Sequence, residues 1–257
     1  MVRKAILLCG VMFVLGVSSA SAVTPIDLTT LGATSTLAGG LWSEVISVPT
    51  GTGNYQPFER LQANGTEQGL NNDLNPSPLD TDHAWTTSLA LSSLQVVHSG
   101  GLDYYAFNLD INESNSEADR LLSLDQLKIY TADDANFASV AALEGDAGTL
   151  LQYNLDATGD YTVLLNHDLQ AGSGHDDMEV LLLKSYFDDA ASTDFVYLYS
   201  QFGLQGGSYT TSDGFEEWKA LRGLNAPPPP SDVPEPSTML LLSGGLVGLL
   251  GIKRRKK

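Results

Sequence analysis

The chain has 257 residues, with 13 Lys or Arg, 31 Asp or Glu and a formal net charge of −18 at pH 7. Six of the basic and 30 of the acidic residues fall between residues 23 and 233, so this body is near −24 when its histidines are neutral. Nucleic acid is excluded as a partner, because phosphate binding needs a basic surface, whereas solubility, divalent-cation binding and a high-salt habitat are all compatible with this charge.

The N-terminus has the pattern of a secretory signal peptide. Arg3 and Lys4 form a positive n-region, and residues 5–17 form an apolar h-region. Ala20 and Ala22 provide the small residues of a cleavage site, so we expect signal peptidase to cut after residue 22. The single cysteine, Cys9, lies in this leader, so the mature chain is expected to have neither a disulfide nor a Cys-ligated metal.

The segment from residue 24 to 79 is rich in Gly, Asn, Thr and Pro. Its one clear apolar strand candidate is Val45 to Val48, with Trp42 nearby, and residues 71–78 read as a loop from their turn-forming composition. We interpret this segment as long excursions on a β domain.

From residue 84 onward, apolar segments recur at regular intervals with turn residues between them. In the clearest one, Tyr105, Phe107, Leu109 and Ile111 alternate with polar residues, as expected of a strand with one buried face. The expected strands are 85–97, 104–111, 121–130, 161–166, 179–184 and 195–202. A short helix is expected within 135–143, and either a last strand or a helical turn at 214–221. This pattern predicts an all-β domain, a β-sandwich of jelly-roll or immunoglobulin-like type.

Two groups of oxygen-bearing side chains suggest calcium binding, because Ca²⁺ takes six to eight oxygen ligands. Side chains two residues apart on a strand share a face, which relates Asp110 to Asn112 and Asp177 to Glu179. The candidate ligands are Asp110, Asn112, Glu113, Asp125, Asp177 and Glu179. The alternative for the first group is a polar strand end with solvated carboxylates, and for the second an acidic hairpin tip.

The sequence offers no strong catalytic pattern. His167 and His175, each followed by Asp, have no recognised zinc spacing. There is no Gly-x-Ser-x-Gly motif, and adjacent carboxylates such as Glu216 and Glu217 point oppositely on a strand, which makes them poor acid–base pairs. We therefore expect no enzyme.

Aromatic residues allow a different function. Tyr197 and Tyr199 share a face by alternation, and together with Trp218 they are candidates for a platform that stacks on sugar rings. The alternative is that these rings pack in the core or on the sheet surface.

The C-terminal region has three parts after a four-proline run at residues 227–230, which should act as a stiff spacer. Residues 233–238 read Val-Pro-Glu-Pro-Ser-Thr, residues 238–252 are mainly apolar, and residues 253–257 are all Lys or Arg. The apolar run would span only about 22 Å as a helix, against a hydrocarbon core of roughly 30 Å, which suits transient retention in a membrane.

The order of these parts closely resembles the PEP-CTERM sorting signal of Gram-negative bacteria that make exopolysaccharide. The resemblance rests on Val233, Pro234, Glu235 and Pro236 together with the apolar run and the basic end. It implies processing near the Pro-Glu-Pro triplet by an exosortase. The body, through segments 107–113, 122–130 and 214–218, is similar to a recurrent passenger type of such proteins for which no activity is implied.

The expected organisation is a signal peptide at 1–22, a sandwich at 23–226, a linker at 227–232 and a sorting signal at 233–257 with a transmembrane segment at 238–252. These features predict an exported protein of the cell envelope or extracellular matrix, structural or adhesive, with calcium as a candidate stabilising ion. Its expected partners are signal peptidase and exosortase during export, the inner membrane through the C-terminal tail, and exopolysaccharide. The alternative is a carbohydrate-binding module for exopolysaccharide, and a secreted hydrolase is the least favoured option.

Overall fold

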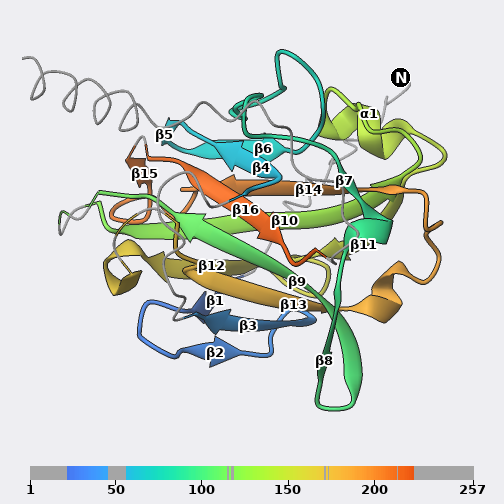
Figure 1. Cartoon of the computed structure of the whole chain (residues 1–257). Coiled ribbons are helices and arrows are strands. Elements are labelled where there is room, and N and C mark those ends of the chain that lie inside the picture. The colour runs from blue at the N-terminus through green and yellow to red at the C-terminus, as the bar shows by residue number, and fades with distance from the viewer. Residues whose placement is uncertain are drawn as a thin grey trace, which may run out of the picture.

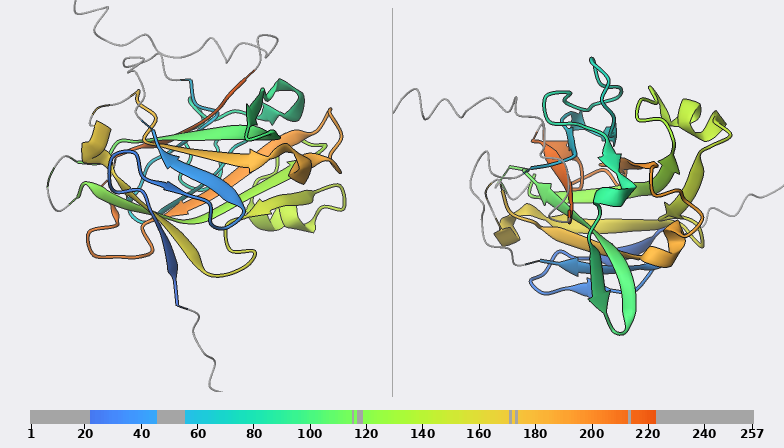
Figure 2. Two further views of the ribbon diagram at one scale, coloured as in Figure 1. Left: turned by 90° about the horizontal axis from the view of Figure 1, so that it is seen from below. Right: turned by 45° about the vertical axis from the view of Figure 1, so that its right-hand side comes forward.

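The computed structural model describes residues 22–45, 56–114, 116, 119–170, 172, 174–212 and 214–222. Two β-sheets pack face to face in this part of the chain (Figures 1 and 2). Residues 1–21 of the expected signal peptide, the linker and the sorting tail lie outside the described residues. Among the described residues, no helix combines the length and the apolar character that crossing a membrane requires.

The first sheet has its strands in the order β1-β12-β10-β14-β6, with β11 paired to β10 and β7 to β14. Its strands are β1 (Thr24–Asp27), β6 (Glu67–Leu70), β7 (Leu89–Ala90), β10 (Leu121–Ala132), β11 (Leu150–Asn154), β12 (Tyr161–Asn166) and β14 (Phe195–Phe202). β1 pairs with β12 in parallel, and the other pairs are antiparallel.

The second sheet has the order β2-β3-β13-β9-β16-β4, with β8 paired to β9, and all its pairs are antiparallel. Its strands are β2 (Thr34–Ser35), β3 (Gly40–Glu44), β4 (Glu59–Leu61), β8 (Val96–Ser99), β9 (Leu102–Ile111), β13 (Met178–Leu183) and β16 (Glu216–Ala220). The hairpin of β8 and β9 extends beyond the body of the sandwich (Figure 1).

The remaining elements are short. β5 (Asn64–Gly65) pairs with β15 (Thr211–Ser212) in a separate two-stranded sheet. The helix α1 (Val140–Gly145) begins after Ser139, whose hydroxyl accepts a hydrogen bond from the Ala142 amide at 3.1 Å. Three 3₁₀ turns complete the set: η1 (Leu91–Ser93), η2 (His167–Gln170) and η3 (Lys184–Phe187).

The main core lies between the two sheets and follows from strand alternation. Tyr105, Phe107, Leu109 and Ile111 all point into it from β9, as their spacing predicts. β10 contributes Leu122, Leu124, Leu127 and Ile129. The change of phase after Leu124 coincides with a register shift against β14, which lets both halves of β10 direct leucines inward.

A smaller apolar cluster covers part of the outer face of the first sheet. Leu143 of α1 packs there with side chains from β6, β10 and β14, namely Leu70, Tyr130, Ala132, Tyr197 and Tyr199. In Figure 1, α1 lies beyond one end of the β10–β14 pair. Both faces of the central strands are therefore buried at this end.

The prediction of an all-β sandwich is confirmed, and the expected strands at 104–111, 121–130, 161–166, 179–184 and 195–202 correspond to β9, β10, β12, β13 and β14. Residues 214–221 contain the strand β16, and the expected short helix begins five residues later than predicted. The observed strand near Trp42 is Gly40–Glu44. Of the expected strand at 45–48, Val45 lies just after β3, and residues 46–48 lie outside the described part.

One prediction was wrong: the expected continuous strand at 85–97 is instead β7, η1 and β8. The 3₁₀ turn changes the direction of successive side chains, so that Leu89, Leu91 and Leu94 all reach the core although they do not share a strand periodicity.

Asn71 provides a test of how the edge strand β6 is held. Its side-chain amide donates to the Val196 carbonyl at 3.0 Å, and its oxygen accepts from the Leu198 amide at 2.7 Å. Asn71→Ala would leave these two buried backbone groups unpaired, so we expect the free energy of unfolding to fall by about 2–4 kcal/mol. Urea denaturation of the purified protein measures this change. The exposed Asn136→Ala is the control, and an equal loss in both variants would contradict the interpretation.

Candidate functional site: carboxyl groups buried between the sheets

The edge strands β4 and β6 form a corner that joins the two sheets, because only residues 62–66 separate them. β4 directs Glu59 and Leu61 inward, and β6 directs Glu67 and Gly69 inward. A Cβ atom at Gly69 would overlap the Leu61 side chain and an Oε atom of Glu59. Glycine is therefore required at this position for the two strands to approach, and it places Glu59 and Glu67 in the interior.

Two further glutamates reach the same region from the second sheet. Glu216 begins β16 and shares the inward face of Trp218, and Trp218 is the cross-strand neighbour of Glu59. Glu113 follows β9 two residues after the inward-facing Ile111. We call Glu59, Glu67, Glu113 and Glu216 the glutamate cluster. Their exposed fractions are 0%, 1%, 4% and 0%, respectively.

Few hydrogen-bond donors serve these carboxyl groups. Glu67 accepts from the Ala63 amide at 2.9 Å, and Glu113 accepts from both the amide and the hydroxyl of Ser212. The Glu216 carboxyl lies within hydrogen-bonding reach of those of Glu67 and Glu113. Otherwise both oxygens of Glu59 and Glu216, and one oxygen each of Glu67 and Glu113, have no partner with standard hydrogen-bond geometry.

Burial raises the pKa of every member of the cluster, because a charged carboxylate is poorly solvated in the interior. It raises the pKa of Glu67 to about 7 and the pKa values of Glu59 and Glu216 well above the usual range, and it also raises the pKa of Glu113. Mutual repulsion adds to the pKa shifts of Glu59, Glu67 and Glu216, while Asp80 repels Glu67 and Asp119 repels Glu113. The folded cluster therefore holds protons more strongly than exposed glutamates do.

Asp125, a predicted calcium ligand, has a different environment on the first sheet. Its carboxylate accepts hydrogen bonds from the hydroxyls of Ser123 and Thr162 at 2.8 and 2.9 Å, the Leu204 amide at 2.6 Å and the Gln205 side chain at 2.8 Å. Four donors satisfy both oxygens, so Asp125 has a structural role that fastens the loop after β14. Asp125 and Asp110 lie on different sheets, so the structure does not bring these two predicted ligands together.

The other predicted calcium ligands are divided between two places. Asp110 and Asp177 lie at the outer face of the second sheet, opposite the inward-facing core residues of β9. Asp110 accepts from the Gly174 amide at 2.7 Å and from the Asn112 side chain at 3.1 Å, and Asp177 accepts from the Ile111 amide at 2.8 Å.

Glu179 belongs to the same outer face. Burial raises the pKa of Asp110 to about 8, and burial also raises those of Asp177 and Glu179. Glu113, in contrast, points into the glutamate cluster, because strand alternation turns it away from Asn112. The six predicted ligands therefore do not form one site. Across the described ranges, no three His, Cys, Asp or Glu side chains are arranged to hold a metal ion as they stand.

The expected sugar-stacking platform is not formed. Trp218 is 0% exposed in the core, where its indole N–H donates to the Ser200 hydroxyl at 3.1 Å. Tyr197 is 1% exposed, and its hydroxyl donates to the Asp134 carbonyl at 2.7 Å. Tyr199 is buried in the cluster beneath α1. A ring can stack on a sugar only if its face is accessible, which excludes this use of the three residues in the described conformation.

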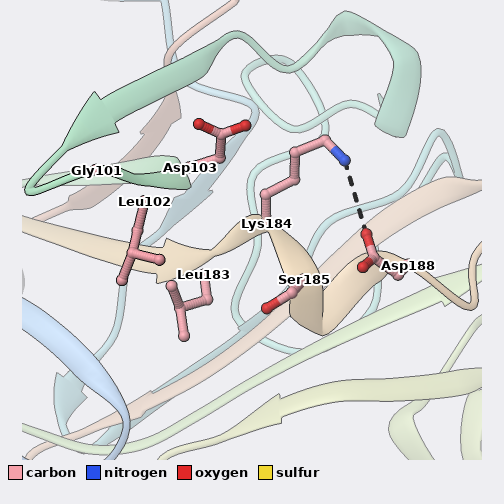
Figure 3. A pocket seen from close by; sticks show the side chains of 7 residues that line it. All are labelled: Gly101, Leu102, Asp103, Leu183, Lys184, Ser185 and Asp188. Carbon is pink, nitrogen blue, oxygen red and sulfur yellow. Dashed lines mark ion pairs between the residues drawn. The ribbon is translucent and has the colours of Figure 1, made fainter.

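A pocket of about 350 Å³ lies beside the turn end of the β8–β9 hairpin (Figure 3). Gly101, Leu102 and Asp103 line one side of it. Leu183 and η3 residues line the other, where Lys184 and Asp188 form an ion pair at 3.7 Å. None of the predicted site residues borders this pocket.

Sequence reasoning missed Glu59, Glu67 and Glu216 as a group. It placed Glu216 and Glu217 on opposite faces of a strand, and the structure confirms this, since Glu217 lies outward, 3.9 Å from Arg60. The missed signal is the alternation of each glutamate with an inward-facing residue: Glu59 with Leu61, Glu67 with Gly69, and Glu216 with Trp218.

Comparison with known proteins identifies the tail. Residues 232–256 match the family model described as the PEP-CTERM protein-sorting motif. The chain therefore contains a PEP-CTERM sorting motif, which indicates an exported, envelope-sorted protein and implies processing by an exosortase. This match covers the tail and leaves the type of the β-sandwich passenger open.

The same comparisons do not identify the β-sandwich body. No curated protein matches the sequence. A solved structure from turnip yellow mosaic virus aligns with 79% of this chain and 95% of its own at 10% identity, with a TM-score of 0.13. At that TM-score the alignment carries no argument about fold or function.

The raised pKa values predict how stability depends on pH when a chelator is present. The folded cluster holds protons that the unfolded chain loses near pH 4.5, so we expect the free energy of unfolding to fall as pH rises from about 4.5 through 7. The shift of Glu67 alone corresponds to about 3 kcal/mol. Urea denaturation at several pH values measures the slope, which should be shallower in Glu216→Gln. The exposed Asp189→Asn is the control, and stability that rises over this range would contradict the prediction.

Proposed function

We propose that this protein is a non-enzymatic, structural or adhesive component of the cell envelope or extracellular matrix, and that the β-sandwich is the displayed passenger. The observation that carries the proposal is a PEP-CTERM sorting motif at residues 232–256 attached to an all-β, acidic body. A strongly acidic surface keeps such a body soluble outside the cell. The mature chain would contain no cysteine, so its stability has to come from its core and from bound groups.

The packing of the body supports a structural passenger. Its inward-facing side chains form one continuous apolar core across both sheets, and a second cluster covers part of an outer face. The buried Asn71 and Asp125 fasten loops and edge strands to that core. Both features favour a rigid displayed unit. The burial of Tyr197 and Trp218 removes the observation that motivated the carbohydrate-binding alternative.

Processing at the sorting motif can be tested with Glu235→Ala, which removes the only carboxylate of the Pro-Glu-Pro triplet. We expect the variant to remain uncut and to stay in the inner-membrane fraction. Intact mass and immunoblotting of cell fractions from the producing bacterium measure this outcome. Ser231→Ala, just outside the matched motif, is the control and should be processed normally. Normal processing of Glu235→Ala would contradict exosortase cleavage at this motif.

The structural or adhesive role needs a separate measurement. Cells that lack the protein should lose attachment to surfaces or cohesion within the extracellular matrix, and expression of the wild-type chain should restore it. Glu235→Ala should fail to restore it because the passenger is not delivered. Unchanged attachment and cohesion in the deletion strain would overturn the proposed role while leaving the sorting of the protein intact.

A further inference from the structure

The glutamate cluster is unusual because its charged neighbours are also acidic. The charged groups that raise the pKa values of Glu59, Glu67, Glu113 and Glu216 are other members of the cluster and two aspartates, Asp80 and Asp119. The ion pairs found in the described residues involve other carboxylates. Opposite charge from Lys, Arg or His therefore does not explain why four glutamates are buried together.

Hydrogen bonding does not explain the cluster either. Asp125, which is also buried, has four donors that satisfy both of its oxygens. Glu59 and Glu216, in contrast, are 0% exposed and have no standard hydrogen-bond partner on either oxygen. The backbone N–H of Asn112 lies near the Glu216 carboxyl, but it does not form a hydrogen bond of standard geometry with either oxygen. An unpaired buried polar group is costly, so these two carboxyls point to a missing partner.

The atoms that the cluster offers as ligands indicate what that partner is. The Glu216 carboxyl lies within hydrogen-bonding reach of those of Glu67 and Glu113, and Glu59 is close enough to Glu67 to be repelled by it. Four carboxyl groups offer only oxygen atoms, and Glu113 also contacts the hydroxyl of Ser212. Hard divalent cations prefer such ligands, and Ca²⁺ accepts carboxylates in one- or two-oxygen coordination with flexible geometry.

We propose that the glutamate cluster binds a calcium-type divalent cation between the two sheets. The ion replaces the protons that otherwise neutralise the carboxyl groups, and it links the β4–β6 corner to the start of β16 and the end of β9. The carboxyl groups do not enclose an ion as they stand, so binding includes a rotation of glutamate side chains. This site differs from the outer face of Asp110 and Asp177, and it shares only Glu113 with the ligands expected from sequence.

The test uses the full chain, purified in a mild detergent and stripped with a chelator. Equilibrium dialysis with CaCl₂ should find one tightly bound ion per chain that Glu216→Gln loses. The melting temperature should rise by roughly 5 °C or more when calcium is a hundredfold above its dissociation constant. Glu216→Gln keeps the shape of the side chain but removes a charged ligand, so this rise should disappear or shrink severalfold.

Two matched variants locate the ion. Glu217→Gln changes the adjacent residue, which faces outward toward Arg60, and should keep the full calcium response. Asp110→Asn changes the outer acidic face and should keep it as well. Glu59→Gln serves as a second cluster variant if Glu216→Gln does not fold, and it should also lose the response.

Three results would overturn the proposal. The first is that the wild-type chain binds no calcium, even if its melting temperature varies with pH, because protons alone would then neutralise the cluster. The second is a calcium response that survives unchanged in the cluster variants. The third is a response lost in Asp110→Asn but retained in Glu216→Gln, which would place the ion at the outer face of the second sheet.

Discussion

The space between the two sheets admits little water, so every side chain that points into it must meet either apolar atoms or a polar partner. Most inward positions satisfy this constraint with apolar side chains such as Phe107 and Leu198. Trp218 satisfies it with a hydrogen bond to Ser200, and Asn71 with bonds to β14. In the described part of the chain, the glutamate cluster is a place between the sheets where protein atoms alone do not satisfy this constraint. The same constraint therefore explains both the stability of the fold and the position of its candidate site.

The longer strands were predictable because each contains a long run of alternating apolar and polar residues or of apolar residues, which a turn does not contain. β9 alternates apolar and polar residues over most of its length, and β12 and β14 were placed at their observed bounds. The short strands between residues 24 and 70 were not, because two to five residues carry too little periodicity. The prediction of one strand at 85–97 failed for a different reason. The 3₁₀ turn η1 brings Leu91 and Leu94 to the core although their spacing does not fit the alternation of a strand.

The site was harder to predict because its residues are far apart in sequence and come from both sheets. The sequence predicted ligands at 110–113 and 176–179 because acidic residues are clustered there. In the structure, Asp110 and Asp177 lie on an outer face and accept hydrogen bonds from backbone amides. Glu59 and Glu67 were each isolated in segments read as loops. Only the packing of β4 against β6, allowed by Gly69, brings them together, and no local pattern reports such a contact between two edge strands.

The position of β16 decides how the sandwich responds to mechanical tension. β16 is the last described strand before the sorting tail, and it pairs with β9 on one side and β4 on the other. Withdrawing this strand from the domain would break its hydrogen bonds to both β9 and β4 and would remove Glu216 and Trp218 from the interior. A domain attached through such a strand resists extraction from its own fold.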